Sequence, residues 1–317
     1  MRAYGFGKIG GPENESLLDV PVPEPGPDEL LVRVRAAGVN PGDWRLREGS
    51  YGVQGPAVLG REVAGTVTRL GAGVSGFAVG DEVFGGCPGM VGGWAEQALV
   101  TASFAAQRPE SVPPEVAAVL PVAAGTAYDA LQNLGLPSGS TLLVNGAGGG
   151  VGICVGQLAV ARGLRVIGTA SPAKHELLAR LGVLPVAYGD GVLDRVRATA
   201  APAGVDAVFD LVGGSALRTV AELVEDRSRL LSVADKELAK QLGGREVVRD
   251  RSSAVLAELA RLVVEGVLDP HVTEVRPLHE AGAALAAVEA GHTLGKIALA
   301  LTPAAVENDV VVIKKAF

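Results

Sequence analysis

The chain has 317 residues, of which 48% are hydrophobic and 20% are charged, and this composition is typical of a globular protein with room for two domains. Its net charge of −7 at pH 7 argues against a general nucleic-acid or anionic-membrane surface. The amino-terminal residues lack an apolar signal core, and no apolar run approaches the length of a membrane span. We therefore expect a cytoplasmic protein that binds neither nucleic acid nor membranes.

Cysteine and histidine are too few and too scattered to suggest a metal centre. The two cysteines, Cys87 and Cys154, exclude a disulfide framework and a multi-cysteine zinc lobe. The four histidines lack the short pair spacing of a metal-binding helix. No metal site is predicted.

The first third of the chain has the pattern of a β-rich domain. Short strand-like runs are separated by glycine-containing loops such as 71–76. The strands expected here span residues 30–35, 62–70, 81–85 and 94–100.

From about residue 121 the pattern changes to strands that alternate with helices. The strands expected here span residues 142–145, 164–169, 186–188, 205–211 and 229–233. This alternation predicts a doubly wound parallel sheet in an α/β fold. An amphipathic helix over 252–265 and a strand–helix–strand pattern through 296–301 follow, and a strand-like tail covers 309–317.

A glycine-rich turn between the first two of these strands is the most informative single motif. The strand at 141–145 leads into a turn with glycines at 146, 148, 149, 150 and 152, and then into a helix. The three-glycine fingerprint of dinucleotide-binding folds fits as Ala147, Gly149 and Gly152, or with Gly146 in first place. Such glycines let backbone N–H groups approach a pyrophosphate, and the helix N-terminus adds partial positive charge. An ordinary glycine-rich turn is the alternative.

The end of the second strand favours NADP(H) over NAD(H). An NAD site usually places Asp or Glu about 20 residues past the glycines, where it binds the ribose 2′-hydroxyl. Here residues 168–171 contain no carboxylate, and Ser171 and Lys174 offer a hydroxyl and a cation suited to the 2′-phosphate of NADP. Alternatively, Ser171 caps a helix that begins at Pro172 and Lys174 is solvated, and both descriptions can hold at once.

Further motifs occur along almost the whole chain: AAGVNPGD at 36–43, LGREVAG at 59–65, VGDEV at 79–83, GWAE at 93–96, AGTA at 124–127, the turn at 145–152, and GKI at 295–297. In this order they resemble the medium-chain dehydrogenase/reductase family, specifically its zinc-independent quinone oxidoreductase branch. The resemblance implies a GroES-like β-rich domain from 1–120 and 268–317, a Rossmann NADP-binding domain over 121–267, and an active-site cleft between them. It also implies a homodimer.

Two positions distinguish this chain from the zinc alcohol dehydrogenases of the family. A cysteine stands there in place of Asn40, and a histidine stands in place of Arg61, before Glu62. Without a Lewis acid, hydride addition to a simple ketone loses transition-state stabilisation. A quinone or an α,β-unsaturated carbonyl spreads the incoming charge onto an oxygen, so hydrogen-bond donors and a proton from water would suffice. The expected activity is NADPH-dependent reduction of a quinone or enone.

The resemblance places three candidate catalytic residues near the nicotinamide and substrate. Asn40 would donate its amide to the developing oxyanion, and Tyr51 would bind the acceptor or relay a proton. Asp43 would orient its neighbours rather than act as an acid. Each also has a structural interpretation: Asn40 forms a turn with Pro41, Asp43 caps the segment 44–47, and Tyr51 packs.

The resemblance also extends the candidate cofactor site. Tyr188 joins Ser171 and Lys174 at the phosphate, and Thr126 and Lys296 match positions near the pyrophosphate or nicotinamide. Thr126 could instead cap its helix, and Lys296 could be an exposed strand lysine. The predicted set is Thr126, Gly146, Gly148, Gly149, Gly150, Val151, Gly152, Ser171, Lys174, Tyr188 and Lys296.

Other functions are compatible with the same fold. A noncatalytic NADPH-binding protein of the zeta-crystallin type would bind the cofactor without turnover, and a tailoring reductase would apply the same chemistry to a larger natural product. Conventional alcohol oxidation would need a metal or a proton relay, and neither is visible in the sequence. An NADPH-oxidation assay with small quinones and enones separates the catalytic and noncatalytic roles.

Overall fold

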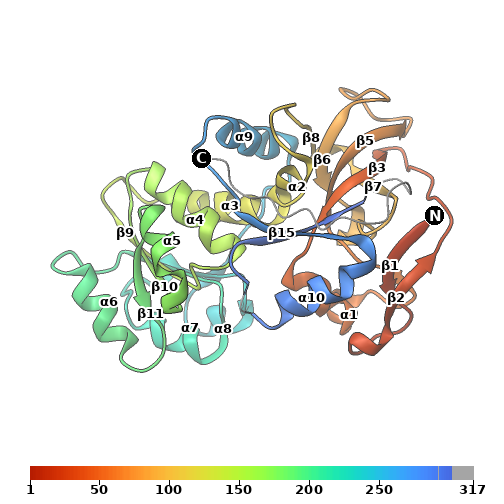
Figure 1. Cartoon of the computed structure of the whole chain (residues 1–317). Coiled ribbons are helices and arrows are strands. Elements are labelled where there is room, and N and C mark those ends of the chain that lie inside the picture. Colours follow the sequence, from red (N-terminus) through yellow and green to blue (C-terminus); the bar gives the residue numbers. More distant parts are fainter. Residues whose placement is uncertain (292, 302–317) are drawn as a thin grey trace. The chain divides into compact units, whose positions relative to one another are not determined.

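The computed structural model describes residues 1–291 and 293–301, which form two compact units (Figure 1). The first unit comprises 1–122, 251–264 and the described residues from 272, and the second comprises 123–250 and 265–271. The strand-like tail expected at 309–317 lies outside the described residues.

The amphipathic helix expected at 252–265 is present as α9 (Ser253–Val264). It belongs to the first unit, whereas the expected domain bounds included it in the second. Packing explains the difference, because α9 contacts β8 (Ala105–Gln107), and the Ser253 hydroxyl donates a hydrogen bond to the carbonyl of Ala102 over 3.2 Å.

Two sheets build the first unit. The larger has the order β15-β16-β3-β5-β6-β8, with β7 also paired to β3, and the smaller has the order β2-β1-β4. The strands are β1 (Arg2–Phe6), β2 (Glu15–Asp19), β3 (Glu29–Gly38), β4 (Ala57–Val58), β5 (Glu62–Leu70), β6 (Glu82–Gly86), β7 (Gln97–Thr101), β8, β15 (Val272–Pro277) and β16 (Lys296–Ala300). The other helices of this unit are α1 (Pro41–Arg47), α2 (Pro114–Ala117) and α10 (Ala281–Glu289).

The register of β3 brings polar residues together at the end of that strand. Gly38 lies opposite Ala298 in the antiparallel pair of β3 with β16, and continuing this register places Asn40 beside Lys296. The antiparallel pair of β3 with β5 similarly places Gly38 opposite Glu62. Facing residues of adjacent antiparallel strands have closely spaced side chains, so this end of β3 gathers an amide, an ammonium and a carboxylate.

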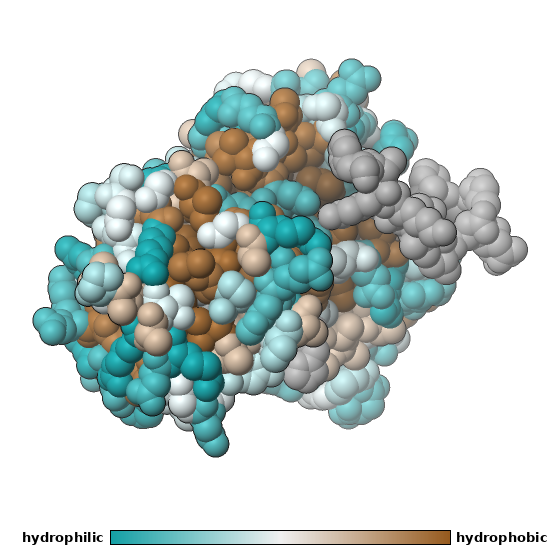
Figure 2. Space-filling view, turned by 60° about the vertical axis from the view of Figure 1, so that its left-hand side comes forward, coloured by the Kyte–Doolittle hydropathy of each residue, from teal (hydrophilic) through white to brown (hydrophobic). Residues whose placement is uncertain are grey.

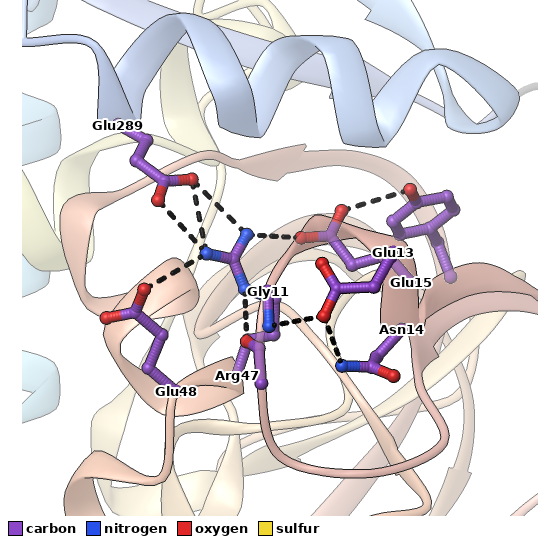
Figure 3. A network of polar contacts seen from close by, with 9 residues as sticks. Gly11, Glu13, Asn14, Glu15, Arg47, Glu48 and Glu289 are labelled. Atoms are coloured by element: carbon purple, nitrogen blue, oxygen red, sulfur yellow. Dashed lines mark hydrogen bonds and ion pairs between the residues drawn. The ribbon is translucent and has the colours of Figure 1, made fainter.

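A buried arginine connects three segments of the first unit that are distant in the sequence (Figure 3). Arg47, at the end of α1, has a side chain that is only 1% exposed. Its guanidinium donates to Glu15 Oε1 at the start of β2 over 2.5 Å, to Glu289 Oε1 in α10 over 3.1 Å, and to the Gly10 carbonyl over 3.1 Å. Glu15 also accepts a hydrogen bond from the Tyr4 hydroxyl, so the ion pair lies within a hydrogen-bonded network.

The second unit contains a parallel sheet with the strand order β11-β10-β9-β12-β13-β14. Numbered along the chain, this order is the 3-2-1-4-5-6 of the doubly wound dinucleotide-binding folds, and the order reverses between β9 and β12. The strands are β9 (Thr141–Asn145), β10 (Arg165–Ala170), β11 (Leu184–Ala187), β12 (Ala207–Asp210), β13 (Leu230–Ser232) and β14 (Arg245–Glu246). The helices are α3 (Gly125–Leu134), α4 (Gly150–Ala161), α5 (His175–Arg180), α6 (Val192–Ala200), α7 (Gly214–Ala221) and α8 (Lys236–Gln241).

The predicted doubly wound parallel sheet and β-rich domain are both confirmed. The short strands β1, β2, β4, β8 and β14 were not predicted, and β14 has only two residues. β11 ends at Ala187, so Tyr188 follows the strand instead of closing it.

No helix in the described part of the chain has the length and apolarity needed to cross a membrane.

The surface mixes polar and apolar residues. Figure 2 shows one face of the molecule, on which hydrophilic residues are interspersed with hydrophobic ones. Among the large hydrophobic side chains exposed in the structure are Tyr51, Tyr188 and Val212. Tyr51 and Tyr188 are candidate site residues, and Val212 lies near the glycine turn.

Candidate active site and cofactor site

The glycine turn joins the carboxyl end of β9 to the start of α4. Gly146 has a φ of +91°, which an L side chain rarely adopts, and a Cβ there would lie 3.0 Å from Val212 Cγ2. A Cβ on Gly152 would lie 2.6 Å from the Ala147 Cα and carbonyl oxygen. Gly146 therefore permits the turn and Gly152 permits the helix to pack on it. Together they expose the N-terminus of a helix at the carboxyl edge of a parallel sheet, as in dinucleotide sites.

A buried hydrogen-bonded chain connects the carboxyl ends of four neighbouring strands. The Thr169 hydroxyl donates to Asn145 Oδ1 over 2.7 Å, and Asn145 Nδ2 donates to Asp210 Oδ1 over 2.7 Å. The Ser232 hydroxyl donates to Asp210 Oδ2, also over 2.7 Å. The backbone N–H of Gly146 donates to the Thr169 hydroxyl over 3.0 Å, so the chain reaches the glycine turn itself. This chain was not predicted, although each of its four residues lies at or next to the end of a predicted strand.

Lys174 extends back over the glycine turn from the segment after β10. Its Nζ donates to the Gly148 carbonyl over 3.4 Å, and a Cβ on Gly148 would lie 2.4 Å from Lys174 Cδ. Burial lowers the pKa of the Lys174 ammonium from its usual value. Because Gly148 has no side chain, the Lys174 ammonium can lie beside the turn. A phosphate bound at the turn would need a cation at this position.

Ser171 and Tyr188 leave adjacent strands at the same level. The last registered pair of β10 and β11 is Ala170 with Ala187, and Ser171 and Tyr188 follow directly. Ser171 occupies the N-cap position of the turn that begins at Pro172 but makes no side-chain hydrogen bond to it. The structure therefore brings Ser171, Lys174 and Tyr188 to the same edge of the sheet as the glycine turn.

Thr126 lies in α3 and contacts Arg249, in the segment that follows β14. Its hydroxyl accepts a hydrogen bond from Arg249 Nη1 over 2.7 Å, and Arg249 Nε donates to Asp129 Oδ2 over 2.7 Å. The N-cap of α3 is Ala124, so Thr126 does not cap this helix. Together with the hydrogen bonds of Asn133 to Arg245 and Val248, the contact with Arg249 holds residues 245–250 against α3.

Asn40, Lys296 and Glu62 form a buried cluster in the first unit. Lys296 Nζ donates to Asn40 Oδ1 over 2.6 Å and to the Val39 carbonyl over 2.9 Å. Asn40 Nδ2 donates to Glu62 Oε1 over 2.8 Å, and the ammonium lies 3.5 Å from that oxygen. A Cβ on Gly38 would lie 2.1 Å from Glu62 Oε1, so this glycine gives the carboxylate room. Lys296 is therefore not an exposed strand lysine, and its contacts join it to Asn40.

Arg61 connects Asp43 to Tyr51. Its Nε lies 3.6 Å from Asp43 Oδ1, its Nη2 donates to the Gly42 carbonyl over 2.7 Å, and its Cζ lies 4.5 Å from the centre of the Tyr51 ring. A Cβ on Gly42 would lie 2.4 Å from Arg61 Cζ. Tyr51 is 62% exposed and has a φ of +71°, a conformation that is strained for a tyrosine and that occurs at ligand sites.

Of the candidate catalytic residues, Asn40 and Asp43 are buried and Tyr51 is exposed. Asn40 is 3% exposed and stands at the N-cap of α1, where its backbone N–H donates to Asp43 Oδ2 over 2.8 Å. Asp43 accordingly supports the start of the helix and orients Asn40. The Asn40 amide carries two N–H bonds, and Glu62 accepts one of them. The Tyr51 side chain, by contrast, is exposed, so its hydroxyl can exchange protons with water.

The buried carboxyl group of Asp43 should make the stability of the protein depend on pH. Burial, opposed by the charge of Arg61, raises the pKa of Asp43 to about 7. The folded state then holds this proton at pH values where the unfolded state has lost it, so the contribution of Asp43 to stability falls as pH rises through 7. The free energy of unfolding of Asp43→Asn, measured relative to that of the wild type, should therefore rise by about 2–3 kcal/mol between pH 5 and pH 8.

Thermal and urea unfolding of both proteins at pH 5, 6, 7 and 8 measures this gain. Glu48→Gln, at an exposed carboxyl of the same segment, serves as the control and should show a constant difference from wild type. A constant difference for Asp43→Asn as well would contradict the raised pKa.

Comparison with known proteins relates this geometry to a family. The model for the alcohol dehydrogenase GroES-like domain matches residues 26–110, and the model for zinc-binding dehydrogenase matches residues 181–299. The chain is 35% identical over 241 residues to quinone oxidoreductase of Rattus norvegicus, which covers 74% of this chain and 73% of the rat protein. The chain belongs to the medium-chain dehydrogenase/reductase family. Its relatives place it in the quinone oxidoreductase branch, and it is an oxidoreductase of that family.

Two further matches bear on ligands of the family. A solved mycobacterial structure complexed with NADPH is 29% identical, with a TM-score of 0.83, and the match covers 95% of this chain and all of the other. The chain is also 33% identical over 308 residues to erythronolide synthase EryA2 of Saccharopolyspora erythraea, a match that covers 90% of this chain but 8% of the synthase.

Within residues 1–291 and 293–301, no group of three or more His, Cys, Asp or Glu side chains is placed to hold a metal ion.

Proposed function

We propose that this protein is an NADPH-dependent reductase that transfers hydride to a quinone or to the β-carbon of an α,β-unsaturated carbonyl. The observation that carries the proposal is the buried cluster of Asn40, Lys296 and Glu62. The two positions that hold zinc ligands in alcohol dehydrogenases of the family contain Asn40 and Arg61, and both side chains are engaged with neighbouring protein groups. Hydrogen-bond donors then replace a Lewis acid, which suits an acceptor that delocalises charge.

The residues of the second unit fit NADP(H). Backbone N–H groups at the start of α4 suit the pyrophosphate, and Gly148 leaves room for Lys174 beside them. Ser171 and Tyr188 would complete the site for the 2′-phosphate, and no carboxylate closes β10. The NADPH complex of the mycobacterial relative supports the same choice.

When bound, the nicotinamide supplies the hydride, and the protein supplies hydrogen bonds and a proton route. The second N–H of Asn40 would donate to the acceptor oxygen as negative charge develops there. Lys296 and Glu62 hold the two ends of the Asn40 amide, so its donor keeps one orientation. Tyr51 would hydrogen-bond the acceptor or relay the proton that completes the reduction.

The match to a segment of erythronolide synthase supports one finer alternative. It favours a tailoring reductase that applies the same chemistry to a larger natural product. An α,β-unsaturated thioester therefore belongs in the assay beside small quinones and 2-alkenals. The homodimer and the cytoplasmic location stay predictions from sequence.

Fluorescence titration with NADPH and NADH, followed by the decay of nicotinamide absorbance with 9,10-phenanthrenequinone, 1,4-benzoquinone, a 2-alkenal and an enoyl thioester, tests the proposal. We expect tighter binding of NADPH than of NADH, and turnover with at least one acceptor class. Binding of NADPH without turnover of any acceptor would favour the noncatalytic, zeta-crystallin-like role. Failure to bind either cofactor would refute the proposal.

A further inference from the structure

Arg195 organises the loop that carries Tyr188. This arginine lies in α6, and its guanidinium points back to the loop between β11 and α6. Its Nε and Nη2 donate to the Ala187 carbonyl over 3.1 and 2.9 Å, and Nη1 donates to the Asp190 carbonyl over 2.7 Å. Nη2 also donates to the carbonyls of Tyr188 and Gly189, each over 3.3 Å.

Four consecutive carbonyl groups therefore converge on one cation. Such carbonyl dipoles repel one another unless a positive charge lies between them, so the guanidinium stabilises this loop conformation. Gly189 and Gly191 have φ values of +89° and +74°, which the tight loop requires. A Cβ on Gly191 would lie 3.1 Å from Arg195 Nη1, so this glycine also leaves room for the guanidinium.

The loop lies at the candidate phosphate site. Tyr188 directly follows the strand pair that ends with Ala170 beside Ala187, and Ser171 follows on the neighbouring strand. In the described part of the chain, the Arg195 guanidinium donates its hydrogen bonds to main-chain carbonyls. These acceptors are neutral, so the guanidinium keeps its net charge and contributes positive potential to the loop.

We propose that Arg195 is a positioning residue for recognition of the adenosine 2′-phosphate, because it fixes the loop that presents Tyr188 beside Ser171. The proposal rests on the NADPH-dependent function proposed above. Arg195 would act through the loop backbone and through its charge, without touching the nicotinamide end of the cofactor. Its loss should therefore weaken ligands that carry a 2′-phosphate far more than ligands that lack it.

Calorimetric titration of the full chain with 2′,5′-ADP and 5′-AMP tests this selectivity. For Arg195→Met, we expect the Kd of 2′,5′-ADP to rise about tenfold and that of 5′-AMP to change less than about twofold. Arg195→Lys keeps the charge but lacks the planar fork, so its Kd should lie between those of wild type and Arg195→Met. Arg197→Met is the matched control: it removes an exposed arginine of the same helix that pairs with Asp194 at 3.7 Å, and it should bind both ligands like wild type.

The outcomes separate this inference from the proposed function. Wild-type affinity for 2′,5′-ADP in Arg195→Met would overturn the role of Arg195 alone, and so would equal weakening of both ligands. If Arg195→Met does not fold, wild-type selectivity in Arg195→Lys would overturn it. A wild-type protein with no preference for 2′,5′-ADP over 5′-AMP would refute the NADP site itself.

Discussion

Replacing Arg47 with leucine should lower the free energy of unfolding by about 3–5 kcal/mol. The expected loss is large because both partners of the ion pair lie inside the protein: the side chains of Arg47 and Glu15 are 1% and 3% exposed. Leucine would leave the Glu15 carboxylate without its countercharge in a medium that solvates it poorly. Urea unfolding at pH 7, monitored by circular dichroism, measures the effect.

A second variant distinguishes the stranded charge from simple loss of packing. Adding Glu15→Gln to Arg47→Leu removes the uncompensated carboxylate and should recover part of the lost stability. Glu48→Gln changes an exposed partner of Arg47, at 46% exposure, and should alter stability by less than about 1 kcal/mol. Equal stability losses in the single and double variants would contradict the account of a stranded carboxylate.

Replacing Asn40 with leucine should reduce kcat for quinone or enone reduction by about 10²–10³-fold. The variant removes the N–H proposed to stabilise the acceptor oxygen, a group whose loss in oxyanion sites has effects of this size. Because the glycine turn and Ser171, Lys174 and Tyr188 all lie in the second unit, the Kd of NADPH should change much less than kcat. Stopped-flow reduction and fluorescence titration provide the two measurements.

Two controls test the specificity of this effect. Asn14→Leu alters an asparagine of the same unit whose amide donates to Glu13 over 3.1 Å, and it should leave kcat unchanged. A thermal melt of Asn40→Leu checks that the cluster of Lys296 and Glu62 still permits folding. A folded Asn40→Leu protein with at least half of the wild-type kcat would show that Asn40 is not the donor.

Local patterns were sufficient to predict much of the fold. The alternation of apolar runs predicted five strands of the parallel sheet, and the glycine turn was correctly placed between β9 and α4. These features depend on neighbouring residues, which a sequence shows directly. Short strands such as β14 were missed because two residues carry no measurable periodicity, and pairing alone defines them.

The parts of the site that the sequence did not predict depend on strand register and on contacts between residues that are distant in the sequence. Lys296 was expected beside the cofactor, and the structure joins it to Asn40 because β16 pairs with β3. Each polar residue of the Thr169, Asn145, Asp210 and Ser232 chain looked like an ordinary strand end, and only the parallel register aligns the four. The role of Arg195 likewise depends on loop carbonyls that converge on its guanidinium only in the folded chain. Contacts of this kind become visible only when the pairing of strands and loops in three dimensions is known.

A single-turnover experiment with deuterated cofactor tests whether the protein transfers hydride from NADPH to a quinone or enone. Protein saturated with NADPH, or with NADPH carrying two deuteriums at C4, is mixed with 1,4-benzoquinone, a 2-alkenal or an enoyl thioester while nicotinamide absorbance is followed. We expect the absorbance to fall with at least one acceptor and to fall more slowly with the deuterated cofactor. Absorbance that stays constant with every acceptor, although NADPH is bound, would contradict this expectation.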